Sequence, residues 1–175
     1  MSSEASRLAK FNRLASAYGT DLYRFAMWLC GNDALAKDVV QETYLRAWKA
    51  LDQLQDEAAA KGWLLTIVRR EYARTFERKV PLFTDVDTVV LTEDSELEPD
   101  DRTEVRLLRR HIMGLAPKYR EPLLLQTVMG FSCEEIAMEL GISKSAVMTQ
   151  LFRAREQLKS KLQDDGMADN VHGIF

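Results

Sequence analysis

Apolar residues recur at steps of three and four along most of the chain, the spacing that places side chains on one face of an α-helix. The first stripe consists of Phe11, Leu14, Tyr18, Leu22, Phe25 and Leu29. The second consists of Leu35, Val39, Val40, Tyr44, Ala47, Trp48 and Leu51. Gly31 and Asn32 lie between the stripes and tolerate the left-handed conformation that ends a helix. Asp33 is the predicted N-cap of the second helix.

A third helical pattern begins at Trp63 and runs to about Lys79. The polar stretch before it, residues 52–61, is expected to form a loop or an irregular turn. The start of this helix is apolar, and its end is rich in arginine. Pro81 ends the pattern because proline cannot continue a helix.

An acidic stretch follows. Residues 81–101 contain eight Asp or Glu and no Lys or Arg. Like charges repel one another and extend a chain. The sequence therefore predicts a flexible linker at residues 81–103, with a short strand-like contact around residues 86–91.

Helical periodicity returns at Val105. Pro117 ends that helix, and another continues to Val128. We expect Pro122 to be tolerated only in the first turn, where its missing N–H costs no hydrogen bond. Gly130 is expected to cap this helix.

Residues 131–161 carry the strongest local pattern. Ser132 and Glu135 have the spacing of a capping box at the start of a helix. Gly141 suits a turn that requires positive φ, and Ser143 is a suitable N-cap for a second helix. The pattern predicts a helix-turn-helix, whose second helix enters the major groove of DNA.

The charge of this second helix supports DNA contact. From Lys144 to Lys161 it carries five Lys or Arg against Glu156 alone, on a chain whose net charge is −3. A local cationic surface is what phosphate binding requires. The alternative is a plain helical hairpin with a solvated basic face, which the offsets of the small Ala137, the glycine and the second cap disfavour.

Composition fits two small helical domains. The chain has 175 residues, with 8 Gly and 4 Pro, few for a protein built from short strands. The fold class is predicted to be all-α, with domains at residues 1–80 and 104–162, the linker between them, and a disordered tail at residues 163–175. Neither a signal peptide nor an apolar membrane span is apparent, and Cys30 and Cys133 suggest no disulfide framework, so we expect a cytoplasmic protein.

No catalytic constellation is apparent in the sequence. The two histidines, His111 and His172, have no metal-ligand neighbours at a usable spacing. We therefore expect a protein that is not an enzyme and that has no metal, cofactor or small-molecule substrate.

Two further segments resemble a known family. Residues 38–48, DVVQETYLRAW, resemble the helix with which sigma factors bind RNA polymerase, and residues 115–126, LAPKYREPLLLQ, resemble the start of their promoter-binding domain. Together with the helix-turn-helix, their order resembles that of an extracytoplasmic-function (ECF) sigma factor of the sigma-70 family.

This resemblance implies partners and sites. The partners would be core RNA polymerase, promoter DNA and an anti-sigma factor, often membrane-tethered. The polymerase-binding residues would be Asp38, Gln41, Glu42, Leu45 and Trp48. The residues for the −10 element would be Lys61, Trp63, Arg69, Arg70, Tyr72, Arg74 and Arg78. The residues for the −35 element would be Lys144, Ser145, Met148, Thr149, Gln150, Arg153 and Arg155.

Several of these residues have a structural alternative. Leu45 and Trp48 fit a core position as well as an interface, and Tyr72 fits core packing better than base stacking. Met148 and Gln150 stand where the family commonly has Lys or Arg. Gln150 is suited to an adenine edge and Met148 to a thymine methyl group.

Two other function classes compete with the sigma factor. A conventional regulator that binds DNA alone, usually as a dimer, would explain the helix-turn-helix but not residues 38–48. A sigma-like decoy that binds an inhibitor would fit the overall acidity, but not the arginine cluster at the end of the third helix. Dependence of DNA recognition on core polymerase distinguishes the three classes.

Overall fold

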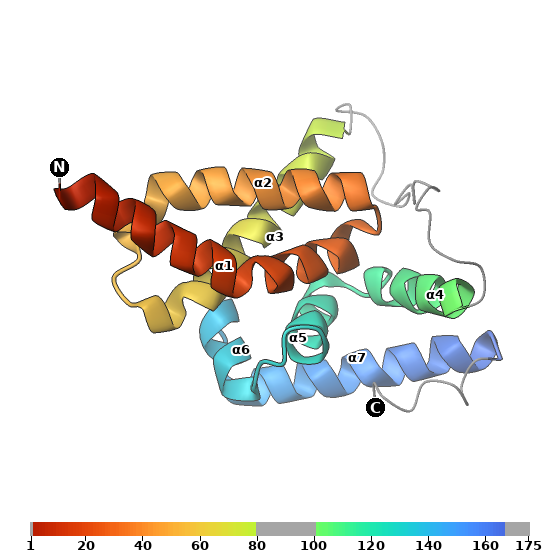
Figure 1. Ribbon diagram of the computed structural model, residues 1–175. Helices are drawn as coiled ribbons and strands as arrows, with labels where there is room; N and C mark the ends of the chain where they lie inside the picture. Colours follow the sequence, from red (N-terminus) through yellow and green to blue (C-terminus); the bar gives the residue numbers. More distant parts are fainter. Residues whose placement is uncertain (1, 80–100, 167–175) are drawn as a thin grey trace. The chain divides into compact units, whose positions relative to one another are not determined.

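The computed structural model of the protein describes residues 2–79 and 101–166, and every regular element in these two ranges is a helix. The chain divides into two compact units, residues 1–95 and 96–175. The described helices of the first unit are α1 (Ser2–Cys30), α2 (Asp33–Ala50), η1 (Leu51–Gln53), η2 (Glu57–Ala59) and α3 (Ala60–Lys79). Those of the second are α4 (Asp101–Met113), α5 (Pro117–Thr127), α6 (Cys133–Leu140) and α7 (Lys144–Asp164). The prediction of two small all-α units is confirmed (Figure 1).

The turn between α1 and α2 depends on two adjacent residues. Gly31 has φ +64°, which favours glycine. Asn32 has extended backbone, and its side chain accepts a hydrogen bond from the N–H of Leu35 at 3.0 Å. Asn32 is therefore the N-cap, and the prediction of Asp33 is wrong by one residue. Asp33 is the first helical residue, where its negative charge suits the positive end of the helix dipole.

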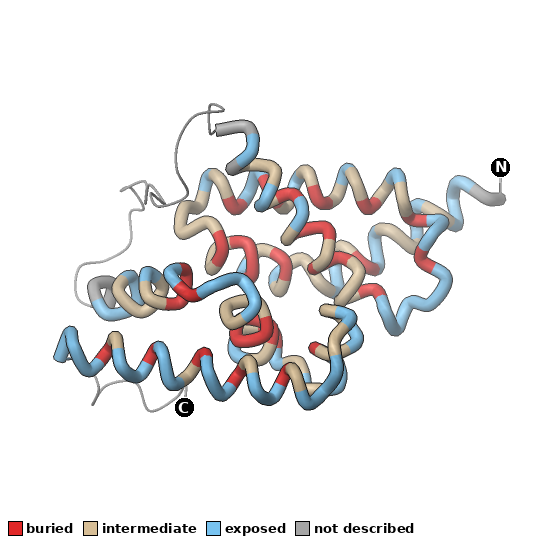
Figure 2. The backbone as a smooth tube through the Cα atoms, turned by 180° about the vertical axis from the view of Figure 1, so that it is seen from behind, coloured by how far each residue is buried: buried red, intermediate tan, exposed pale blue. Residues whose placement is uncertain are grey.

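The three α-helices of the first unit bury their predicted apolar stripes against one another (Figure 2). The fully buried side chains include Leu22, Phe25, Val39, Leu64 and Leu65. Each such side chain contributes about 1.5–3 kcal/mol when it leaves water. This packing fixes which faces of α2 and α3 remain available for partners.

The predicted loop at residues 52–61 is more ordered than expected. It consists of η1 and η2, and α3 begins at Ala60. Leu54 and Ala60 are buried in a cluster that also contains Leu14 and Leu51. Through Leu54 and Ala60, this short segment packs against Leu14 of α1. Lys61, expected within the loop, lies in a helix.

The helix-turn-helix of the second unit is formed as predicted. The Ser132 hydroxyl accepts from the N–H of Glu135 at 3.2 Å, and the Glu135 carboxylate accepts from the N–H of Ser132 at 2.8 Å. Gly141 has φ +66°, and the Ser143 side chain caps α7 by accepting from the N–H of Ala146. The inner face of α7 is buried through Val147, Leu151, Ala154, Leu158 and Leu162.

The position of Pro122 differs from the expectation. Helix α5 begins at Pro117, so Pro122 lies in the second turn and not in the first. Its ring is buried, and this apolar contact offsets part of the cost of the missing helical hydrogen bond. Gly130 has φ +70° and donates its N–H to Gln126, as expected for a residue that ends this helix.

Two predicted boundaries are also shifted. Helix α4 begins at Asp101, within the stretch assigned to the linker, and α7 continues to Asp164, within the predicted tail. The acidic residues at the start of α4 are suited to a helix N-terminus. The rest of the predicted linker, the strand-like contact at residues 86–91 and the tail from residue 167 lie outside the described residues.

Candidate functional site

The outward face of α2 carries a mixed surface that the fold of the first unit does not use. Asp38 and Gln41 are exposed, and Glu42 is half-exposed. Leu45 lies on the same helix with 52% of its surface exposed. An exposed leucine surrounded by polar groups is suited to a helix–helix contact, in which the apolar residue anchors and the polar residues fix the register. The core alternative for Leu45 is therefore wrong.

Trp48 has a different environment from Leu45. Its ring packs edge-on against Phe11, with centroids 5.4 Å apart, and the Arg7 guanidinium lies 4.8 Å from its centroid. Arg7 also donates to the Trp48 carbonyl oxygen at 2.7 Å. Trp48 joins α1 to α2, so it supports the α2 surface from within the unit. A polymerase contact through its remaining exposed edge stays a prediction.

The predicted −10 residues divide into two groups. Trp63 packs against the cluster around Leu51, and the Lys61 ammonium lies 3.3 Å from the Asp21 carboxylate. Tyr72 is partly buried, which agrees with its packing alternative. These side chains help to hold α3 against the unit.

The arginines of α3 are the remaining members of the −10 set. Arg70 is exposed, and Arg69 is partly buried. Arg74 is half-exposed and donates to the carboxylate of Glu71 at 2.6 Å. Arg78 lies in the last turn of α3, and its side chain is outside the described part of the chain. The basic track expected along this helix is thus partly neutralised by Glu71.

Glu71 is a site residue that the sequence analysis missed. It is only 4% exposed, yet its carboxylate lies on the α3 face that meets α2. In addition to its hydrogen bond with Arg74, the Glu71 carboxylate lies 3.3 Å from Nε of Arg46 on α2. The available signal was its position, because Glu71 is the acid of α3 that stands between Arg70 and Arg74 and follows the apolar stripe of the helix, whereas Glu77 is exposed.

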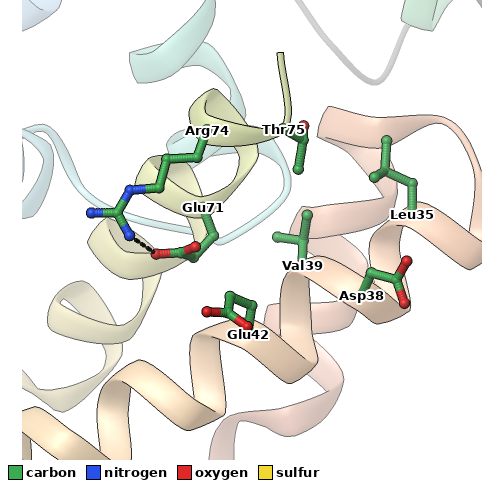
Figure 3. A pocket seen from close by; sticks show the side chains of 7 residues that line it. All are labelled: Leu35, Asp38, Val39, Glu42, Glu71, Arg74 and Thr75. Atoms are coloured by element: carbon green, nitrogen blue, oxygen red, sulfur yellow. Dashed lines mark hydrogen bonds and ion pairs between the residues drawn. The ribbon is translucent and has the colours of Figure 1, made fainter. Parts of the chain in front are cut away.

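Glu71 borders a pocket of about 240 Å³ between α2 and α3 (Figure 3). Its lining residues are Leu35, Asp38, Val39, Glu42, Glu71, Arg74 and Thr75. The α2 side of the pocket contributes two of the predicted polymerase-binding carboxylates, and the α3 side contributes a predicted DNA-binding arginine. The two predicted surfaces therefore meet at this pocket.

The N-terminal half of α7 presents most of the predicted −35 residues. Ser145, Met148, Thr149 and Arg153 are exposed. The Thr149 hydroxyl donates to the Ser145 carbonyl oxygen at 3.0 Å, which holds the threonine against its own helix. An exposed face at the start of the second helix is what insertion into a major groove needs, so these residues stay predicted DNA contacts.

Three other predicted residues of α7 have partners or are recessed. Lys144 forms an ion pair with Glu134 of α6. That hydrogen bond lowers the pKa of Glu134 and raises the pKa of Lys144. Arg155 is partly buried and donates to the side chain of Gln126 of α5. Gln150 is partly buried, and its buried Oε1 has no hydrogen-bond partner among the described residues.

The start of α5 lies beside Arg153 and extends the basic surface of α7. Desolvation alone would raise the pKa of Tyr119, but a hydrogen bond from Arg153 and the charge of Lys118 lower it overall. The Lys118 ammonium lies 5.0 Å from the centroid of the Tyr119 ring. This positive group of side chains is suited to a phosphate.

Phe152 is the second residue that the sequence analysis missed. It lies one turn after Met148 on α7 and is 65% exposed. A large exposed aromatic side chain on a basic helix is suited to an apolar contact in a DNA groove. The sequence feature that could have revealed it is its position directly after Leu151, outside the apolar stripe of α7.

Metal and membrane features are absent from the described residues. Over residues 2–79 and 101–166, no group of His, Cys, Asp and Glu is arranged to hold a metal ion. In the same ranges, no helix has the length and apolar character needed to cross a membrane.

Comparisons with known proteins agree with this arrangement. The family model of Sigma-70 region 2 matches residues 14–80, and that of Sigma-70 region 4 matches residues 105–158. The ECF RNA polymerase sigma factor SigL of Mycobacterium tuberculosis is 31% identical over 172 residues, covering 93% of this chain and 94% of SigL. SigM of Bacillus subtilis is 29% identical over 156 residues, covering 87% and 94% of the two chains.

Solved structures show the same fold. The structure of CnrH in complex with the cytosolic domain of CnrY matches with a TM-score of 0.69 and 25% identity, covering 89% of this chain and 88% of CnrH. RpoE of Bartonella quintana, in complex with the anti-sigma factor NepR, matches with a TM-score of 0.65 and 24% identity, covering 88% and 97%. The chain belongs to the ECF family of RNA polymerase sigma factors, with a region 2 unit and a region 4 unit.

Proposed function

We propose that this chain binds core RNA polymerase through the outward face of α2 and recognises promoter DNA through α3 and α7. The observation that carries the proposal is the exposed Leu45 surrounded by Asp38, Gln41 and Glu42, in a chain that also has a helix-turn-helix. A DNA-binding regulator that acts alone has no use for that α2 surface. The protein is an initiation factor and not an enzyme, and it acts in the cytoplasm, where polymerase and promoter meet.

At the −10 element, the exposed Arg70 provides the most direct phosphate contact. Arg69, Arg74 and Arg78 extend this track. Opening the duplex requires a base to leave the stack, and Tyr72 and Trp63 are aromatic residues of α3 that remain partly exposed. Lys61 adds a further phosphate contact when its ammonium group leaves the Asp21 carboxylate and binds the DNA backbone.

At the −35 element, the N-terminal half of α7 reads the major groove. Met148 provides an apolar contact, while Ser145, Thr149 and Gln150 provide hydrogen-bonding groups. Lys144, Arg153 and Arg155 contribute positive charge for the DNA backbone. Phe152 adds an apolar contact beside Met148.

An anti-sigma factor regulates the protein in this proposal. Two structural neighbours are complexes with a second protein, the cytosolic domain of CnrY in one and the anti-sigma factor NepR in the other. The exposed α2 face is the surface that such a partner would cover, because covering it prevents polymerase binding. A membrane-tethered partner would link release of the sigma factor to an external signal.

The test is transcription in vitro from a promoter library with purified core polymerase. The expected result is a small set of transcripts that need both the chain and the core enzyme. Sequence-specific DNA binding without core polymerase, together with no effect on transcription, would favour a conventional regulator. Binding to an anti-sigma factor with no transcription from any promoter would favour the decoy.

A further inference from the structure

Glu71 has an unusual electrostatic position between the two predicted surfaces of the first unit. Its side chain is 5% exposed, whereas those of Arg46 and Arg74 are 42% and 41% exposed. The hydrogen bond from Arg74 to Glu71 is 2.6 Å long, and Arg46 Nε lies 3.3 Å from the same Oε1 atom. A buried carboxylate is costly unless a cation remains beside it. Glu71 therefore keeps at least one of the two arginines.

Arg46 lies between two carboxylates. Its Nε is 3.3 Å from Glu71 and 3.5 Å from Glu42, one turn earlier on α2. This nitrogen is buried, and it makes a hydrogen bond to neither carboxylate. A small rotation of the side chain would bring it into hydrogen-bonding geometry with one acid at the expense of the other.

The outer ends of this chain of charges belong to the two predicted binding surfaces. Glu42 lies beside Asp38 at the pocket in Figure 3, and these two acids suit a basic group of the polymerase. Arg74 lies on the α3 side of the same pocket and belongs to the predicted DNA track. The order along the chain of charges is Glu42, Arg46, Glu71 and Arg74.

We propose that Glu71 is a positioning residue that couples polymerase binding to promoter binding through Arg46. When Arg46 moves fully to Glu71, it frees Glu42 for a basic group of the polymerase. The same movement replaces Arg74 at Glu71, so Arg74 can turn to a DNA phosphate without leaving the buried carboxylate unpaired. Coupling of this kind is reciprocal, so each partner strengthens the binding of the other. This inference rests on the proposed function.

The Glu71→Gln substitution provides the sharpest test because it keeps the shape of the side chain and removes its charge. In the full-length variant, Arg74 is released and Arg46 turns to Glu42, where it competes with the polymerase. We expect the affinity of the holoenzyme for a fluorescent −10 fork-junction DNA to rise about fivefold, and the affinity of the chain for core polymerase to fall about fivefold. A role in folding alone would lower both affinities.

Two controls separate the coupling from a general charge effect. Glu77→Gln removes the same charge from an exposed site of α3 and should leave core affinity unchanged. In an Arg74→Gln background, Glu71→Gln should give no gain in DNA affinity beyond that of Glu77→Gln. Affinities that fall together, or a gain that persists without Arg74, would overturn the proposal.

If the Glu71→Gln variant does not fold, the Arg46→Gln variant provides the test. The expected changes in the affinities for core polymerase and for DNA are then reversed. Without Arg46, Glu42 is free and core affinity rises, while Glu71 retains Arg74 and DNA affinity falls. Losses at both interfaces would overturn the proposal. If the wild-type chain binds neither core polymerase nor promoter DNA, the proposed function itself has failed, which is a different outcome from either of these.

Discussion

Lys144, the first residue of α7, is paired with Glu134 in the first turn of α6. The lysine is a predicted DNA contact, and its partner belongs to the other helix of the helix-turn-helix. Lys144 must therefore exchange a carboxylate for a phosphate when α7 enters the groove. Both side chains are more than half exposed, so the exchange is expected to cost little.

Removing the acid should make that exchange unnecessary. We expect Glu134→Ala to raise the affinity of the holoenzyme for −35 DNA about threefold at low salt, with a smaller gain at high salt because salt screens exposed charges. Fluorescence anisotropy over a salt series measures this effect. Glu156→Ala removes the same charge from an exposed site of α7. An equal gain in this control would attribute the effect to total charge and not to the pair.

The same pair predicts a pH dependence. The hydrogen bond from Lys144 lowers the pKa of Glu134 from the ordinary value of 4.5. Because the pKa in the folded state is lower than in the unfolded chain, the pair stabilises the fold above the unfolded pKa. This contribution disappears as the pH falls through the folded pKa. NMR titration of the Glu134 carboxyl should give a midpoint below 4.5 that rises in Lys144→Ala. A wild-type midpoint at or above 4.5 would contradict the pair.

Phe152 should affect DNA recognition without affecting the fold. Because its side chain is 65% exposed, Phe152→Ala should change the free energy of unfolding by less than about 0.5 kcal/mol. The affinity for −35 DNA should fall about fivefold or more through loss of an apolar contact. Urea denaturation and anisotropy measure the two quantities. A change in stability with unchanged DNA affinity would show that Phe152 packs within the second unit.

Trp48 should affect the fold before it affects polymerase binding. Trp48→Ala removes the contacts with Phe11 and Arg7, and we expect a loss of about 2–3 kcal/mol in the free energy of unfolding. Leu45→Ala, on the exposed side of the same helix, should cost less than about 0.5 kcal/mol. Urea denaturation of the two variants checks this difference. Equal losses would mean that Leu45 is also a packing residue.

The sequence predicted most of the fold because its signals are local. The capping box of Ser132 and Glu135, the positive φ of Gly141 and the apolar stripe of α7 depend only on residues close together in the chain. The errors arose where two local rules compete. Asn32 and Asp33 are both good N-caps, and the extended backbone of Asn32 after the positive φ of Gly31 decides between them. Pro122 is tolerated in the second turn because its ring is buried, a contact that spacing alone does not predict.

The site was less predictable because its ion pairs join different helices. The sequence analysis predicted Arg74 as a DNA contact without an internal partner. In the structure, Glu71 binds Arg74, and Arg46 of α2 lies beside the same carboxylate. The burial of Glu71 depends on how α2 packs against α3, which the periodicity of either helix does not determine. Exposure likewise distinguishes Leu45 from Trp48, although in the sequence both fit a core position as well as an interface.

The most direct test of the central claim is the equilibrium affinity of the full-length chain for core RNA polymerase. Leu45→Ala should weaken this affinity at least fivefold, because Leu45 is the apolar anchor of the α2 surface. Val105→Ala, an apolar residue of the second unit with the same 52% exposure, should change it less than twofold. Equal affinities of the wild type and Leu45→Ala, or no measurable binding by the wild type, would contradict the account.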